Sequence, residues 1–158
     1  MQDLKKELLA AAEEGNAEAQ FNLGVMLENG VDDNGYAVEG SKAKAMRAGA
    51  IKWLSSAAEQ GLSRAQLQLA EAYAAGGEAP EDYAKAGGWF LVAMTGLSGV
   101  HRQRARSGYE RVCSRLTPAQ VKKATRFAQA WKLKKGAQPL SEDNARARSP
   151  AAPPMPGA

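Results

Sequence analysis

The sequence predicts an all-α fold: a short solenoid of antiparallel helix pairs, followed by a disordered C-terminal tail. Residues 11–30 (AAEEGNAEAQFNLGVMLENG) return at 57–76 (AAEQGLSRAQLQLAEAYAAG) with a spacing of 46 residues. A second pair of stretches, 50–61 and 87–96, aligns Trp53 with Trp89 at a spacing of 36 residues. Repeats of this length indicate helix pairs that bury their apolar faces by stacking on their neighbours.

The first helix of each repeat is predicted by small and apolar residues four positions apart, a pattern typical of an amphipathic helix. This stripe consists of Ala19, Leu23 and Leu27 in the first copy and of Ala65, Leu69 and Tyr73 in the second. Gly24, replaced by Ala70 in the second copy, lets another helix approach closely. We expect Asn16 to cap the first copy, and Ser63 to form a capping box with Gln66 in the second.

The second helix of each repeat carries the tryptophan. The difference between the two spacings leaves 10 additional residues in the first repeat, within GVDDNGYAVEGSKAKAM at 30–46. Glycines and turn-forming residues predict that this insertion is a loop between the paired helices. In the second repeat, Pro80 suits the first turn of its helix.

The two ends of the stack differ from the repeats. An opening helix at 4–12 resembles the second half of a missing repeat, and a closing helix begins where Thr117 and Gln120 form a capping box around Pro118. Its apolar face consists of Val121, Ala124, Ala128 and Trp131. The segment 136–158 holds five of the seven prolines and no aromatic residue, so it is predicted to be disordered, with a proline-rich ligand as the alternative.

Composition limits the function classes. The length of 158 residues suits one domain, and a single cysteine, Cys113, excludes an internal disulfide. No apolar run approaches the roughly 18 residues of a membrane-spanning helix. We therefore expect no membrane insertion and a cytoplasmic protein, or a periplasmic one if an export signal has been removed. Residues 1–36 hold two lysines and eight acids, whereas residues 100–135 hold eleven Lys/Arg and one glutamate, so the two ends favour different contacts.

Catalytic and metal-binding motifs are weak in this sequence. Neither a zinc-protease, a serine-hydrolase nor a P-loop motif is present, and the one histidine, His101, shares an arginine-rich stretch with Cys113. Asp32 and Asp33 superficially suggest a calcium loop, but Gly30 and Ser41 stand where that loop needs oxygen ligands. We expect no enzyme, cofactor or metal; a small hydrolase that uses His101 is the rival hypothesis.

The repeat resembles the Sel1-like family, a relative of the tetratricopeptide repeats. AEAQFNLGVML and RAQLQLAEAY match its first helix, and IKWLSSAAEQG and GGWFLVAMTG match its second, although the last stretch lacks the paired alanines. The resemblance covers roughly residues 1–135 and implies a right-handed α-solenoid. It divides the chain into repeats at about 12–60 and 61–96, terminal capping helices at 99–135 and the tail at 136–158.

The resemblance implies protein binding. We expect a bacterial adaptor or immunity protein that binds another protein or peptide, such as an effector or an assembly protein. The alternative is a cell-envelope scaffold that binds peptidoglycan or an anionic glycan through its basic end; nucleic acid is disfavoured because no nucleic-acid motif accompanies the charge. The oligomeric state stays open, with head-to-tail contact between copies as one alternative.

Three groups of residues are predicted to contact partners. The first helix of each pair lines the concave face in related solenoids, and insertions often decorate a binding face. Exposed arginines favour an anionic partner, with a solvated helix face as the alternative. The concave residues are Glu18, Phe21, Val25, Glu28, Arg64, Leu67 and Glu71; the loop residues are Asp32, Asp33 and Tyr36; the anion-binding residues are Arg104, Arg111 and Arg115. For Phe21 and Val25, packing in the core is the alternative.

Overall fold

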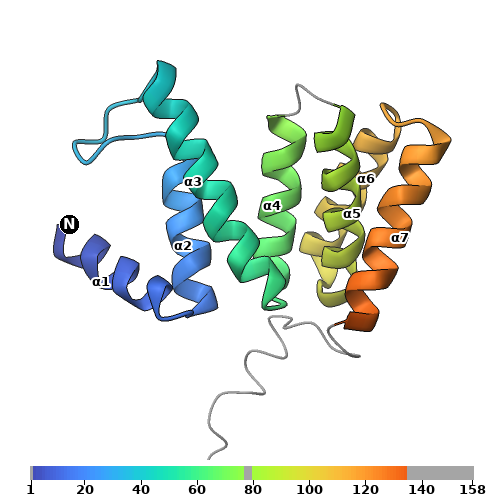
Figure 1. Ribbon diagram of the computed structural model, residues 1–158, viewed down its shortest axis with the longest axis horizontal. Helices are drawn as coiled ribbons and strands as arrows, with labels where there is room; N and C mark the ends of the chain where they lie inside the picture. The colour runs from blue at the N-terminus through green and yellow to red at the C-terminus, as the bar shows by residue number, and fades with distance from the viewer. Residues whose placement is uncertain (1, 77–79, 135–158) are drawn as a thin grey trace, which may run out of the picture.

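The computed structural model describes residues 2–76 and 80–134, and these form a row of stacked helices (Figure 1). The elements are α1 (Gln2–Glu13), α2 (Ala17–Glu28), α3 (Gly40–Glu59), α4 (Ser63–Ala75), α5 (Pro80–Gly96), α6 (Gly99–Cys113) and α7 (Pro118–Lys134). Each helix from α1 to α5 packs on the next, and α6 and α7 both pack on α5. The predicted all-α stack of helix pairs is confirmed. The predicted tail at 136–158 lies outside the described residues.

The main core runs through the middle of the stack. Leu54 of α3, Leu69 of α4 and Phe90 of α5 are fully buried in it. At the closing end, Trp89 meets Phe127 and Trp131 of α7 edge-to-face, with ring centroids 5.1 and 6.3 Å away. The repeating tryptophans are not equivalent, because Trp53 of the first repeat is only partly buried, against a smaller cluster at the α1–α2 contact.

Close approach between α2 and α3 depends on Gly24. A Cβ atom at this position would lie 2.5 Å from Cγ of Leu54, well inside van der Waals contact. The equivalent residue of the second repeat, Ala70, is fully buried. The second repeat therefore accommodates a methyl group at the position where the first repeat has no room for one.

Two of the three predicted side-chain caps are confirmed, and α5 begins at Pro80 as predicted. Asn16 accepts a hydrogen bond from the amide of Ala19 at 2.9 Å. At the start of α7, the amide of Thr117 donates to Gln120 Oε1 at 2.8 Å, and the amide of Gln120 donates to Thr117 Oγ1 at 3.3 Å. The capping box predicted at Ser63 is wrong, because Leu62 is the cap residue and Ser63 begins the helix.

Gln66, assigned to that capping box, has a different role. Its side-chain amide is buried and donates to the carbonyl of Ala58 at 3.2 Å. The equivalent glutamine, Gln20, donates to the carbonyl of Ala12 at 3.0 Å. Both donor and acceptor recur at the spacing of 46 residues, so each glutamine ties its helix to the C-terminal end of the preceding one. A buried carbonyl at a helix end needs such a donor.

The insertion is only partly a loop. Helix α3 begins at Gly40, ten residues before the predicted start of the second helix, so the insertion lengthens α3 as well as adding a connection at 29–39. The connection folds back on itself through a bridge between Val31 and Ala37. Figure 1 shows it projecting beyond the end of α2, on the side of the stack that α1 occupies.

Candidate functional site

Helices α2, α4 and α6 form one face of the stack, which we call the inner face. Polar side chains link these helices in sequence. Arg64 of α4 donates to Glu18 of α2 at 2.6 Å, and Gln68 of α4 donates to Glu28 of α2 at 2.5 Å. Further along the stack, Arg104 of α6 donates hydrogen bonds to both carboxylate oxygens of Glu71 of α4, at 2.6 and 2.5 Å. We call these contacts the inner ladder.

Four of the seven residues predicted on the concave face take part in the inner ladder. Glu18, Glu28, Arg64 and Glu71 are on this face, but their charged groups contact neighbouring repeats rather than empty space. Each ligand that binds here must compete with these contacts or accept the surface that they form. The ladder therefore aligns the repeats and gives the inner face a fixed pattern of charge.

The apolar residues predicted on the concave face lie deeper. Leu67 is 4% exposed and belongs to the main core, so its assignment as a partner contact is wrong. Phe21 is partly buried against the same core, and the guanidinium of Arg64 covers its ring at 5.0 Å from the centroid. Val25 is partly buried as well. Core packing, the alternative reading of Phe21, matches its contacts.

The predicted loop residues lie apart from the inner ladder and are well ordered by hydrogen bonds. Asp32 Oδ1 accepts from the amides of Asn34 and Tyr36 at 2.9 and 3.0 Å. These two bonds, that of Tyr36 first, hold the pKa of the Asp32 carboxyl below its usual value of 3.8. Asp33 pairs with Lys5 of α1, and Tyr36 is 72% exposed.

The loop borders an apolar hollow of about 350 Å³ between α1, α2 and α3, which we call the loop hollow. Its lining residues are Lys5, Leu9, Leu23, Met26, Leu27, Asn29, Val31, Asp32, Asp33, Gly35, Met46 and Trp53. Three of its apolar side chains are at least 40% exposed: Leu9, Met26 and Val31. This site was not predicted from the sequence, because α1 and α3 converge on the loop only in the folded stack. The available signal was the apolar character of Met26, which lies off the buried stripe of α2.

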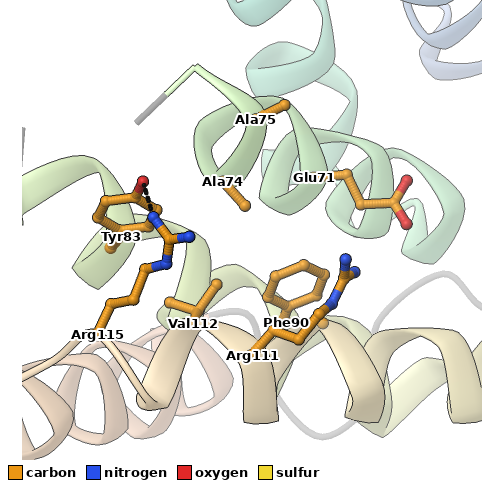
Figure 2. Close-up of a pocket in the computed structure, with 9 residues that line it drawn as sticks. Glu71, Ala74, Ala75, Tyr83, Phe90, Arg111, Val112 and Arg115 are labelled. Carbon is orange, nitrogen blue, oxygen red and sulfur yellow. Dashed lines mark hydrogen bonds between the residues drawn. The ribbon is translucent and has the colours of Figure 1, made fainter. Parts of the chain in front are cut away.

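A second hollow of about 490 Å³ lies between α4, α5 and α6, and we call it the arginine hollow. Its lining residues are Glu71, Ala74, Ala75, Tyr83, Phe90, Gly108, Arg111, Val112 and Arg115. Figure 2 shows Arg111 and Arg115 reaching from the α6 side toward this space, with Phe90 between α6 and α4. Two of the predicted anion-binding residues, Arg111 and Arg115, therefore line this hollow. The third, Arg104, lies next to the hollow, because it donates to the carboxylate of the lining residue Glu71.

Arg115 does not lie on the same helix as Arg104 and Arg111, although all three were grouped as anion-binding residues. Helix α6 ends at Cys113, and Arg115 belongs to the following turn. Its side chain donates to the hydroxyl of Tyr83 at 2.9 Å and covers the Tyr83 ring at 5.3 Å (Figure 2). Tyr83 and Phe90 were not predicted as site residues, and their position beside α6 follows from packing between repeats.

His101 and Cys113 are not brought together by the fold. Twelve residues on one α-helix separate them by about 18 Å along its axis, and His101 is exposed. Cys113 instead lies beside Tyr109; burial raises the pKa of Tyr109 to about 12, and contact with Cys113 adds to the rise.

Within 2–76 and 80–134, no group of three or more acidic, cysteine or histidine side chains is placed to hold a metal ion. Over the same residues, no helix is both long and apolar enough to cross a membrane.

These features define a helical-repeat protein of the α-solenoid class, a type of scaffold that presents stacked helices to other proteins. The chain is similar in structure to a protective antigen present in uropathogenic Escherichia coli strains, whose crystal structure displays an SLR (Sel1-like repeat) fold. The TM-score is 0.66 at 30% sequence identity, over 94% of this chain and 28% of the antigen. No protein-family model matches the chain, and no curated protein does.

The chain therefore has the Sel1-like repeat fold, as the resemblance predicted. It spans less than a third of the antigen's length. The fold is that of a repeat module for protein interaction.

Proposed function

We propose that this protein is a non-catalytic adaptor or immunity protein, which binds a partner protein through its 30–41 loop, the adjoining loop hollow and the inner face. The observation that carries the proposal is the loop hollow. Apolar side chains from α1, α2 and the loop are exposed together there, with charged residues at the rim. A central apolar patch inside a polar rim is the usual arrangement of an interaction hot spot.

The contacts around the loop hollow support binding of a folded partner. The Lys5–Asp33 ion pair joins α1 to the loop across one side of the hollow. The Asp32 hydrogen bonds hold the loop in one conformation, which lowers the entropy lost on binding. Tyr36, exposed beside this site, has the large amphipathic side chain that interfaces favour.

The experiment is a pull-down from lysate of the source organism at low and high salt. The baits are wild type, a Met26→Asp/Tyr36→Asp variant and a Leu133→Asp control. Met26, Tyr36 and Leu133 are 43%, 72% and 84% exposed, so circular dichroism is expected to show folded protein in every case. We expect one stoichiometric protein that wild type and the control retain at high salt and that the double variant loses.

A partner that the double variant retains would contradict the loop hollow as the interface. The alternative function is a cell-envelope scaffold that binds peptidoglycan or another anionic polysaccharide through α6 and α7. The basic end of the chain favours this alternative, because Arg111 and Arg115 form no ion pair with another described residue. A polysaccharide that all three baits hold at low salt and release at higher salt would support this alternative.

A further inference from the structure

We infer that the arginine hollow is a second recognition site, which binds an extended segment of a partner protein carrying an aspartate or glutamate side chain. This inference rests on the proposed function as a protein-interaction module, and it adds a site at the other end of the stack with a defined ligand chemistry. It is carried by the charge, the shape and the preorganisation of the hollow.

Among the described residues, the charge of the hollow is positive, and no carboxylate that lines it is free to balance this charge. Glu71 is the one carboxylate among the described residues that line the hollow, and Arg104, which does not line it, donates to both Glu71 oxygens. Arg111 and Arg115 therefore remain as two cations with no carboxylate partner in the described part of the chain. The neighbouring acid of α6, Glu110, pairs with Arg106 instead. A ligand carboxylate supplies the missing negative charge.

The position of Arg115 is set before a ligand arrives. One of its five N–H donors is used on the Tyr83 hydroxyl, and the guanidinium carbon lies 5.3 Å from the centroid of the Tyr83 ring. The remaining donors keep the planar fork that matches a carboxylate. Arg111 is four residues earlier in the chain and points into the same space (Figure 2). A side chain held in one orientation loses less entropy on binding.

The shape of the hollow favours a protein segment over a sugar or a nucleic acid. Its walls include the small residues Ala74, Ala75 and Gly108, which leave room for an extended main chain. Phe90 and Val112 close the floor, so the base of the hollow is apolar rather than lined with hydrogen-bonding groups. A volume of about 490 Å³ lies within the range of specific ligand pockets. The hollow thus combines an apolar base with two cations at its edge.

The probe is a library of random heptapeptides displayed on phage at the N-terminus of a coat protein, so that no peptide carries a free C-terminal carboxylate. Panning on the wild-type protein is expected to enrich Asp or Glu beside an apolar residue. The most enriched sequence is then synthesised with an amidated C-terminus, together with a copy in which Gln replaces each acidic residue. Fluorescence anisotropy measures the binding of both peptides.

Three variants test where the peptide binds. We expect Arg111→Gln and Arg115→Gln each to weaken binding about tenfold, the effect of losing one charge-assisted contact. Arg102→Gln is the matched control, since it removes the same charge from α6 at an exposed residue that does not line the hollow. Loss of binding in the Gln copy of the peptide supports the inference as well. Circular dichroism confirms that each variant is folded.

Four outcomes would overturn the inference. One is a library that yields no enriched peptide, or only peptides without acidic residues. Another is an acidic peptide that Arg102→Gln weakens as much as Arg111→Gln does, since binding would then follow net charge alone. The third is a peptide whose binding is abolished by Met26→Asp/Tyr36→Asp and is unchanged by Arg111→Gln. The peptide would then bind at the loop hollow and not at the arginine hollow, and the proposed function would stand. A single-stranded oligonucleotide or a peptidoglycan fragment that binds in an Arg111-dependent manner, when no acidic peptide does, also contradicts the inference.

Discussion

Replacing Gly24 with alanine tests whether close helix contact holds the first repeat together. The new Cβ would lie 2.5 Å from Cγ and 2.7 Å from Cδ2 of Leu54, which is fully buried. Because Cγ is the branch point of that side chain, a rotation of the chain end does not relieve the clash. Overfilling a packed core typically costs about 1–3 kcal/mol. Alanine in place of a helical glycine stabilises by about 1 kcal/mol, so the expected net loss is about 1 kcal/mol.

The matched control is Gly49→Ala in α3. A Cβ there would meet only the end of the Leu27 side chain, at 3.2 Å from Cδ1, which is able to move aside. This variant is expected to gain up to about 1 kcal/mol from helix propensity. The two variants should therefore differ by about 2 kcal/mol in urea unfolding followed by circular dichroism. Equal stability of Gly24→Ala and Gly49→Ala would refute the argument from close packing.

A double variant separates the clash from other effects. Leu54→Ala alone should cost about 2–5 kcal/mol, because it leaves a cavity in the core. When Gly24→Ala is added to Leu54→Ala, the new methyl group meets free space instead of Cγ. We therefore expect the combined loss to be smaller than the sum of the two single losses. Strict additivity would mean that the two residues do not interact.

Three further predictions concern charged and titrating groups. A double-mutant cycle on Arg104 and Glu71, a bidentate pair whose glutamate is 19% exposed, should give a larger coupling energy than the same cycle on the exposed Arg106–Glu110 pair, for which about 0.3–0.5 kcal/mol is expected. The Tyr109 hydroxyl keeps its proton to about pH 12 in the folded protein but loses it near pH 10 in the unfolded chain. The free energy of unfolding should therefore fall as the pH rises from 10 toward 12, and this fall should be less steep in Tyr109→Phe. Since hydrogen bonds lower the pKa of Asp32, its carboxyl should titrate below 3.8 by NMR, and Asp32→Ala should speed amide exchange at Asn34 and Tyr36; unchanged exchange would mean that the loop is held by other contacts.

Periodicity in the sequence was sufficient to predict the helical stack. The apolar stripe of each repeat recurs because stacked helix pairs have to bury the same face, so the pattern carries the architecture. Local capping signals at Asn16 and Thr117 were reliable because the cap forms within three residues of the helix start. The capping box at Ser63 failed because Leu62 is the cap residue of this helix, and the Gln66 side chain is directed at the buried Ala58 carbonyl, to which its amide nitrogen donates.

The candidate sites depended on the tertiary structure. Sequence spacing placed Arg111 and Arg115 near each other, but not Tyr83, which comes from another helix and orients Arg115. It also placed Leu67 on a binding face, although contact between repeats buries it. Binding surfaces of a solenoid form where neighbouring repeats meet, and the offset between repeats sets which side chains remain exposed. The sequence by itself determined which helices form and that they stack; only their packing decided which residues a partner can reach, because exposure is a property of the stack and not of any single helix.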